Sequence, residues 1–512
     1  MKKFVLITSI LILCVVVSTC IFPINKLSTK EKREDAEYLV DFLVENYPYF
    51  DIKKESLKYD FLAHKDEITN KIIKTKNDKE FYCAIDETLN LLNNNHCYII
   101  NDKGQIEYLT SKNDLNYCGD INSKAVERAD YWNNIRFKTT YIPDVIFKYV
   151  DGNYFVQFSK NKDINVGDIL VKIEGMNVEK YLESNKEKYP LIYDKENKEI
   201  YTNSILFITH EINNKNKINV TCLSNNEEKN GTVNIEKGNE EKILNIYKKI
   251  CKNQIDPIKT KIISKDNIAY MSVAHMSSEE KVMAQIDNFF REYKNYKNII
   301  IDIRGNLGGS SEVSFNIIKN INKEESLIID TYIGYNKSLF NDKYLEKNCI
   351  PELNKNDLPK KLNDIFKEDT MVENIKMPIF HSLDAFQGNI YLLIDNNVFS
   401  ASETLASIVK KCKLGVILGQ TSTGDGLSHN PIVNMLPNSN ICFQIFNQMI
   451  VFSNGEINSK TCTVPDYYIK VNPNDYQKLL REKEKNNIDD IELNLIKYDT
   501  VLNECIKIIN NK

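Results

Sequence analysis

The chain has 512 residues and a net charge of −4, with 67 Lys and Arg against 71 Asp and Glu. This length is enough for several domains and a large buried core. Charges of both signs are interspersed without a basic stripe, which argues against a nucleic acid as partner. The histidines form no HxxxH or HExxH pair and the cysteines show no CxxC spacing. We therefore expect no metal and no cofactor.

The N-terminus has the pattern of a membrane-targeting segment. Lys2 and Lys3 precede an uncharged apolar run from Phe4 to about Ile24. Such a run is long enough to span a bilayer, and no small-x-small cleavage site follows it. We expect residues 1–25 to be an uncleaved signal anchor, or a signal peptide if they are cleaved, with the remaining chain outside the cytoplasm. A buried core helix is the alternative, and the charged flanks argue against it.

Two amphipathic helices are predicted before residue 100. Residues 34–51 form the first, which ends in an aromatic-rich turn. Residues 79–92 form the second, since apolar residues recur along it at helical spacing. This second helix leads into a short Asn-rich segment that ends at His96. A histidine after a helix is most often a surface residue or a partner of the C-terminal helix dipole.

A β-rich module is predicted between residues 140 and 240. Residues 166–178, VGDILVKIEGMNV, combine a turn, a short apolar strand and a glycine-containing hairpin turn. They resemble the VGDxI…IxGxxV signature of PDZ domains, which implies recognition of an extended peptide by strand addition. An inert β subdomain that only shapes a cleft is the alternative. The polar residues 227–242 are expected to form a surface junction after this module.

A first strand–loop–helix unit is predicted at residues 298–321. Three consecutive isoleucines, residues 299–301, indicate a buried parallel strand. Asp302, Arg304 and a loop with Gly305, Gly308 and Gly309 follow. The loop matches neither GxxxxGK[ST] nor GxGxxG, so a phosphate site is not indicated. It is either a tight turn or a loop in which Gly308 or Gly309 offers an N–H group to an oxyanion.

A second strand–loop–helix unit is predicted at residues 388–409. The apolar run 390–394 ends at a turn and is followed by SASE, residues 400–403, and a helical pattern. A serine at such a junction lies beside unpaired N–H groups, where a hydroxyl can act as a nucleophile. The alternative is that Ser400 or Ser402 only caps the helix and Glu403 completes a capping box.

Together these two units resemble the core of peptidase family S41, the C-terminal processing and tricorn-like serine proteases. Later segments have the order of that family, including an aromatic-rich strand predicted over 442–452 and a Pro-Asp pair at 465–466. The resemblance implies a multidomain α+β fold. Its expected parts are an N-terminal helical domain (30–135), a PDZ-like β domain (140–240) and an α/β, crotonase- or ClpP-like S41 catalytic core with C-terminal helices (245–512).

The resemblance also implies catalytic roles. Ser400 would be the nucleophile and His96 the general base. The N–H groups of Ala401 and of Gly308 or Gly309 would form the oxyanion hole.

The third catalytic residue is left open by the sequence. One branch of the family uses a lysine in a segment like TFGKG, but Asp425 stands at the aligned position, which disfavours a Ser–Lys dyad. The tricorn-like branch has a glutamate before the Pro-Asp pair, where this chain has Ser459, with Glu456 three residues earlier. Either Glu456 or Asp425 orients the base, or the site is weakened.

The expected function is hydrolysis of peptides or unfolded proteins outside the cytoplasm by a serine peptidase. The expected partners are that substrate and, through residues 1–25, the membrane. Two alternatives remain: a weakened or inactive pseudoprotease that binds peptides, and an acyl-CoA enzyme on a crotonase-like core.

Overall fold

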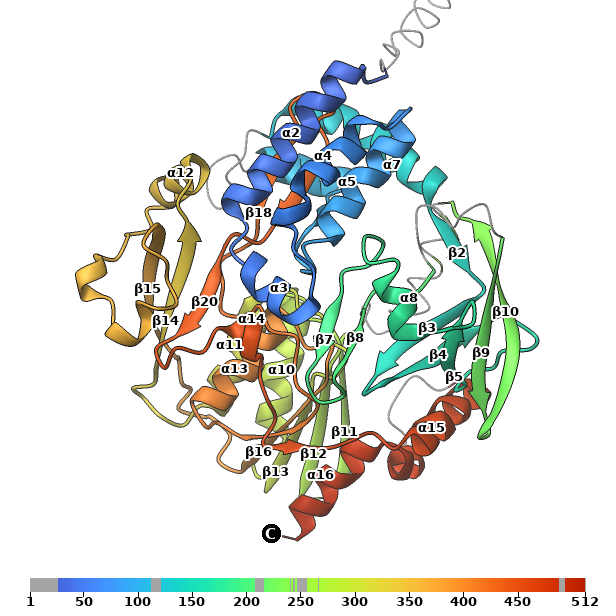
Figure 1. The fold of residues 1–512 in the computed structure, drawn as a ribbon. Helices are drawn as coiled ribbons and strands as arrows, with labels where there is room; N and C mark the ends of the chain where they lie inside the picture. Colours follow the sequence, from blue (N-terminus) through green and yellow to red (C-terminus); the bar gives the residue numbers. More distant parts are fainter. Residues whose placement is uncertain are drawn as a thin grey trace, which may run out of the picture.

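The computed structural model describes residues 26–111, 121–207, 216–239, 241–242, 245, 256–265, 267–487 and 493–511. The predicted signal anchor, residues 1–25, lies outside this range. Within the described ranges, no helix has the length and apolar character needed to cross a membrane. The chain has an α+β fold. It consists of a helical N-terminal part, an antiparallel sheet, a mostly parallel core sheet and smaller sheets (Figure 1).

The N-terminal part is helical, as predicted. Its helices are α2 (Thr29–Asn46), α3 (Phe50–Leu57), α4 (Lys65–Ile73), α5 (Asp78–Asn90), α6 (Lys103–Ser111) and α7 (Ser123–Thr139). Helix α2 begins at a capping box made by Ser28 and Glu31. It ends before Pro48, because the residue that precedes a proline is disfavoured in helical conformation. The predicted helix 34–51 is therefore parts of two helices, α2 and α3.

A seven-stranded antiparallel sheet has the order β2-β10-β9-β5-β4-β3, with β6 paired to β5. The glycine-containing turn between β5 and β6 agrees with the predicted hairpin. The predicted surface junction at 227–242 is wrong, because residues 227–234 of β10 pair with β9 and residues 235–237 pair with β2. Val233 and Ile235 of β10 are buried and alternate with polar residues, as in a half-buried strand. The strands are β2 (Tyr141–Pro143), β3 (Val145–Val150), β4 (Asn153–Ser159), β5 (Ile169–Ile173), β6 (Met176–Asn177), β9 (Lys217–Ser224) and β10 (Glu227–Lys237).

The core sheet has the order β11-β12-β13-β16-β17-β21, and all of its pairs are parallel except β11 with β12. Strands β13 and β16 confirm the two predicted buried strands. The carboxyl ends of β13 and β16 lie side by side, and from them start the glycine-rich loop and the segment that contains Ser400. The strands are β11 (Ile258–Ser264), β12 (Ile268–Val273), β13 (Asn298–Asp302), β16 (Asn389–Ile394), β17 (Val416–Gly419) and β21 (Tyr467–Tyr468).

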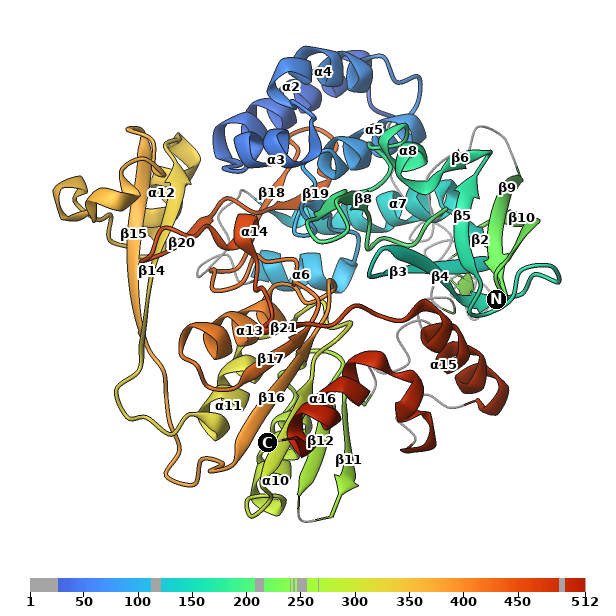
Figure 2. The same ribbon diagram turned by 60° about the horizontal axis from the view of Figure 1, so that its bottom comes forward.

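Helices cover both faces of the core sheet. Helices α10 (Glu280–Glu292), α11 (Ser311–Ile321) and α13 (Ala401–Lys411) pack on the face that includes Ile299 and Ile301. Helix α16 (Thr500–Asn510) covers the opposite face of the sheet (Figure 2). Its buried residues pack in one cluster with Ile300. Helix α15 (Pro473–Asn486) extends toward the antiparallel sheet.

Two three-stranded sheets connect distant parts of the chain. One joins β1 (Tyr98–Ile99) to β19 (Cys442–Ile445) and β18 (Ile432–Met435). The other joins β15 (Thr370–Pro378), β14 (Ile328–Asn336) and β20 (Met449–Phe452). The predicted strand 442–452 is thus two strands in different sheets. The remaining α-helices and strands of the described residues are α8 (Val178–Glu183), α12 (Leu339–Lys347), α14 (Asn458–Thr461) and the hairpin of β7 (Ile192–Asp194) and β8 (Glu199–Tyr201).

Candidate active site

Ser400 lies in a strained turn between β16 and α13. Its backbone has φ 58° and ψ −121°, a conformation that costs a non-glycine residue on the order of 1–3 kcal/mol. Its side chain makes no capping hydrogen bond. The Oγ of Ser402 instead accepts from the Phe399 N–H at 3.0 Å and donates to the carbonyl of Asn306 at 2.6 Å. The capping alternative is therefore wrong for both serines, and the Ser400 hydroxyl is not used to hold the helix.

The glycine-rich loop lies directly against Ser400. A Cβ atom on Gly308 would lie 2.8 Å from the carbonyl oxygen of Phe399 and 2.9 Å from Ser400 Cβ. The Gly308 N–H is donated to Asn306 Oδ1 at 2.8 Å. The N–H groups of Gly309 and Ala401, by contrast, have no hydrogen-bond partner in the part of the chain that is described. Two unengaged donors thus lie near the serine.

His96 reaches this region through a pairing between the two ends of the chain. Strand β1, two residues after His96, pairs with β19, and Gln444 donates to the His96 carbonyl at 3.1 Å. The imidazole lies between Phe399 and Phe446, with ring centroids at 4.5 and 5.0 Å. Its Nε2 is buried and has no hydrogen-bond partner among the described residues. Burial lowers the pKa of His96 to about 3, so the ring is neutral at pH 7.

Asp425 is connected to the histidine loop. Asn94 donates from Nδ2 to Asp425 Oδ2 at 2.9 Å, and Asn94 Oδ1 accepts from the His96 N–H at 2.8 Å. Only 4% of Asp425 is exposed, and its Oδ1 has no partner among the described residues. Burial raises the pKa of Asp425 to about 6, although Lys53 and Asn94 act in the opposite direction. The structure thus brings together Ser400, His96 and Asp425, three of the predicted site residues.

Glu456 lies elsewhere. Its carboxylate forms an ion pair with Lys411, the last residue of α13. Ser400 lies at the other end of this helix, directly before its first residue. The eleven residues of that helix separate the two positions by roughly 15 Å. The hydrogen bond from Lys411 lowers the pKa of Glu456, and 46% of the side chain is exposed. The prediction that Glu456 orients the base does not fit this geometry.

Two residues near the site were not predicted as functional. Glu403 is fully buried and accepts hydrogen bonds from Ser407, Asn458 and Thr463, while burial raises its pKa. Lys53, from α3, lies near Asp425, and burial lowers its pKa. Glu403 is the last residue of the SASE segment, and the sequence pattern there indicates a capping box rather than a functional carboxylate. No local pattern in the sequence singles out Lys53.

A cavity of about 530 Å³ adjoins these residues. Its lining includes Asn94, Phe399 and Asp425, and also Lys53. The β7–β8 hairpin contributes several lining residues and so forms one wall of the cavity. It is attached to the segment before Ser400 by a hydrogen bond from the Tyr201 hydroxyl to the Asn396 carbonyl, at 3.2 Å. Ser400 itself is not a lining residue, but it directly follows Phe399, which is one.

Comparisons with known proteins give a family match and a shared fold. The model described as peptidase family S41 matches residues 267–469, and a search of curated proteins found no match. Mature CPAF complexed with lactacystin is 13% identical, with 94% of this chain and 99% of that chain covered and a TM-score of 0.57. A second structure of mature CPAF is 12% identical, with 94% of this chain and 98% of that chain covered and a TM-score of 0.56. The photosystem II D1 C-terminal processing protease is 12% identical, with 86% of this chain and 94% of that chain covered and a TM-score of 0.40.

The CPAF structures share their fold with almost the whole of this chain. The family match covers both strand–loop–helix units, from the start of β12 to the end of β21. Residues 267–469 therefore form a serine peptidase domain of family S41.

Proposed function

We propose that this peptidase cleaves peptides or unfolded proteins outside the cytoplasm, with Ser400 as nucleophile and His96 as base. The observation that carries the proposal is the strained Ser400, whose side chain makes no capping hydrogen bond and which lies against the glycine-rich loop. Among the described residues, the N–H groups of Ala401 and of Gly309 in that loop have no partner. Strain of this kind persists where the surrounding fold maintains it, and it is concentrated at reactive sites. The buried, unpartnered Nε2 of His96 supplies the second part of the argument.

In this mechanism Ser400 Oγ attacks the substrate carbonyl while neutral His96 accepts its proton. The imidazolium then delivers the proton to the leaving amine, and water repeats the sequence to release the acid. The Ala401 and Gly309 N–H groups stabilise the tetrahedral oxyanion, since Gly308 donates to Asn306. Apo sites commonly have looser catalytic hydrogen bonds than substrate complexes, so the ring is expected to turn slightly on binding.

We assign the acidic role to Asp425 rather than Glu456. An imidazolium that forms in a buried site needs a nearby negative charge. Asp425 is the carboxylate connected to the His96 loop through Asn94, and one of its oxygens is unused. Lys53 lowers the pKa of Asp425 and so favours its ionised form.

The antiparallel sheet over residues 141–237 is proposed to be the PDZ-like module. Among the described residues, its end strands β2 and β3 each pair with one strand only, and strand addition of a peptide requires such an open edge. The core sheet with its helices is proposed to be of the crotonase type. Location outside the cytoplasm is supported by the basic and apolar pattern of residues 1–25.

A fluorophosphonate probe tests the nucleophile. We expect stoichiometric labelling of the unmodified protein, with the label on Ser400, and no labelling after Ser400→Ala. The matched control is Ser56→Ala, because Ser56 lines the same cavity but donates to the Ile52 carbonyl at 3.0 Å. Labelling that persists in Ser400→Ala, or is lost in Ser56→Ala, would refute the assignment.

Asp425→Asn should stabilise the protein while it reduces activity. The carboxyl has a pKa near 3.8 when unfolded and about 6 when folded, so its ionised form destabilises the fold above pH 6. The variant should gain about 3 kcal/mol in free energy of unfolding at pH 8, and most of the gain should disappear near pH 4. Urea unfolding at the two pH values measures this.

The same group should set the acid limb of activity. In the unmodified protein kcat/KM should fall as the pH drops through about 6, where Asp425 becomes protonated. Asp425→Asn should lower kcat/KM by roughly 100-fold or more at pH 8, because the imidazolium loses its counter-charge. Unchanged activity would remove Asp425 from the mechanism.

A further inference from the structure

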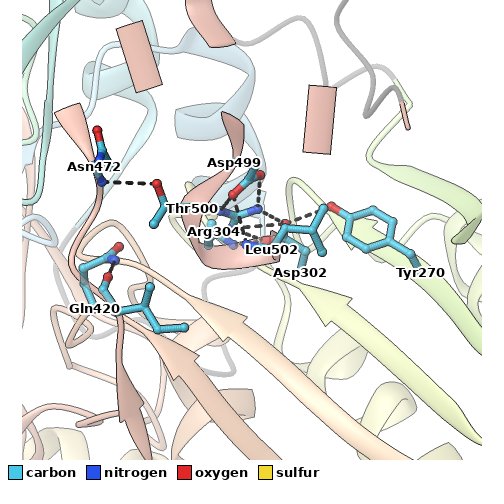
Figure 3. Close-up of polar contacts among 9 residues, drawn as sticks. Tyr270, Asp302, Arg304, Gln420, Asn472, Asp499, Thr500 and Leu502 are labelled. Atoms are coloured by element: carbon cyan, nitrogen blue, oxygen red, sulfur yellow. Dashed lines mark hydrogen bonds and ion pairs between the residues drawn. The ribbon is translucent and has the colours of Figure 1, made fainter. Parts of the chain in front are cut away.

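The glycine-rich loop begins at Arg304, and this side chain is held between two carboxylates (Figure 3). Its Nε and Nη2 donate to Asp302 at 2.9 and 2.6 Å, and its Nη1 and Nη2 donate to the two oxygens of Asp499 at 2.8 Å each. Tyr270 adds a hydrogen bond from its hydroxyl to Asp302 Oδ2 at 2.8 Å. A planar guanidinium that binds a carboxylate through two donors is fixed in orientation as well as position.

Asp499 is itself fixed in place by the last described helix. It caps α16, where its Oδ1 accepts from the Leu502 N–H at 3.1 Å. Leu502 and other apolar residues of α16 are buried against the core sheet. The next residue, Thr500, accepts from the Asn472 N–H at 3.1 Å (Figure 3). The carboxylate that holds Arg304 is thus presented by a docked helix.

Three of the four residues after Arg304 are held by hydrogen bonds, and the last of them, Gly308, directly precedes the candidate oxyanion donor Gly309. Gly305 donates to Asp395 Oδ1 at 2.9 Å, which joins the loop to the end of β16. Asn306 then donates to the Val273 carbonyl at 2.8 Å and accepts from the Gly308 N–H. Gly305, Gly308 and Gly309 all have positive φ. A loop with this backbone freedom depends on outside contacts for a single conformation.

We infer that Arg304 and Asp499 are a positioning pair, through which helix α16 sets the place of the Gly309 N–H group of the oxyanion hole. The inference rests on the proposed function, because it assigns that N–H group to the tetrahedral intermediate. Neither side chain touches the substrate. Both act through the loop that follows Arg304.

Asp499→Asn tests the pair with little change in shape. The asparagine keeps the Oδ1 that caps α16 but loses the charge and one of the two acceptors for Arg304. We expect kcat per titrated active site to fall about 10- to 100-fold, with KM changed by less than about twofold. The affinity for a peptide aldehyde, which forms a tetrahedral adduct with the serine, should fall by the same factor as kcat.

Glu504→Gln is the matched control. Glu504 lies on the same helix, but its partner is Lys507 on the exposed side. This variant should keep kcat, KM and aldehyde affinity, even if it loses a small part of the stability of α16.

An Asp499→Asn protein with unchanged kcat and aldehyde affinity would overturn the inference, whatever its melting temperature. If that variant does not fold, Arg304→Lys provides the test, since lysine keeps the charge and loses the two-donor geometry. It should show the same selective loss of kcat, and full kcat would again overturn the inference. Full activity in Ser400→Ala would instead refute the proposed function, so the two failures are distinguishable.

Discussion

Ser400→Ala should hydrolyse a fluorogenic unfolded protein roughly 10⁴- to 10⁶-fold more slowly than the unmodified protein, as kcat/KM measures. The hydroxyl is the atom that forms the acyl bond, and the neighbouring donors and cavity retain only the contributions of binding and oxyanion stabilisation. His96→Ala should cost a comparable factor. The double variant should lose little more than either single one, because nucleophile and base act as a unit.

A decrease in kcat/KM of the double variant equal to the product of the two single decreases would contradict this account. It would show that the two side chains act independently. Ser56→Ala is again the control. It lines the cavity and should keep full activity.

Gly308→Ala should lower kcat by roughly 100- to 1,000-fold. The new methyl group would lie 2.8 Å from the Phe399 carbonyl oxygen and 2.9 Å from Ser400 Cβ, so the loop or the serine turn must move. Movement of either displaces the donors from the place where the oxyanion forms. Steady-state kinetics with titrated active sites measures the effect.

Gly305→Ala is the matched control for backbone strain. Gly305 also has positive φ, but its Cβ would meet only the flexible end of Lys148, at 3.4 Å. It should lose about 1 kcal/mol of stability and little kcat. Equal losses of kcat in the two variants would show that strain, rather than contact with Ser400, controls activity.

The parts of the fold that the sequence predicted well are those with strong local signals. The three isoleucines of β13 and the apolar run of β16 have few alternatives to buried parallel strands. The polar strand β10 was mistaken for a junction, because charged residues on its exposed face outweigh the alternation of Val233 and Ile235. The break between β19 and β20 depends on buried amides such as Asn447, whose partner Asn341 is distant in sequence.

In the candidate site too, residues with a local sequence signal could be predicted, whereas contacts between distant segments could not. Ser400 and His96 could be named because a family pattern surrounds each of them. The connection of Asn94 to Asp425 joins residues 331 positions apart, and no local pattern predicts it. Glu456 stood near the expected position in the sequence, but its pairing with Lys411 follows from the direction of α13. Asp499 carries no motif, and only the docking of α16 brings it to Arg304.

The central claim is that His96 and Ser400 work on one substrate carbonyl. A peptide chloromethyl ketone tests it directly, because the serine adds to the ketone and thereby holds the chloromethyl carbon against the base, which is alkylated. Peptide mapping by mass spectrometry should find the added mass on His96, and none there in Ser400→Ala. Alkylation of a different histidine, or of His96 equally with and without Ser400, would contradict the account.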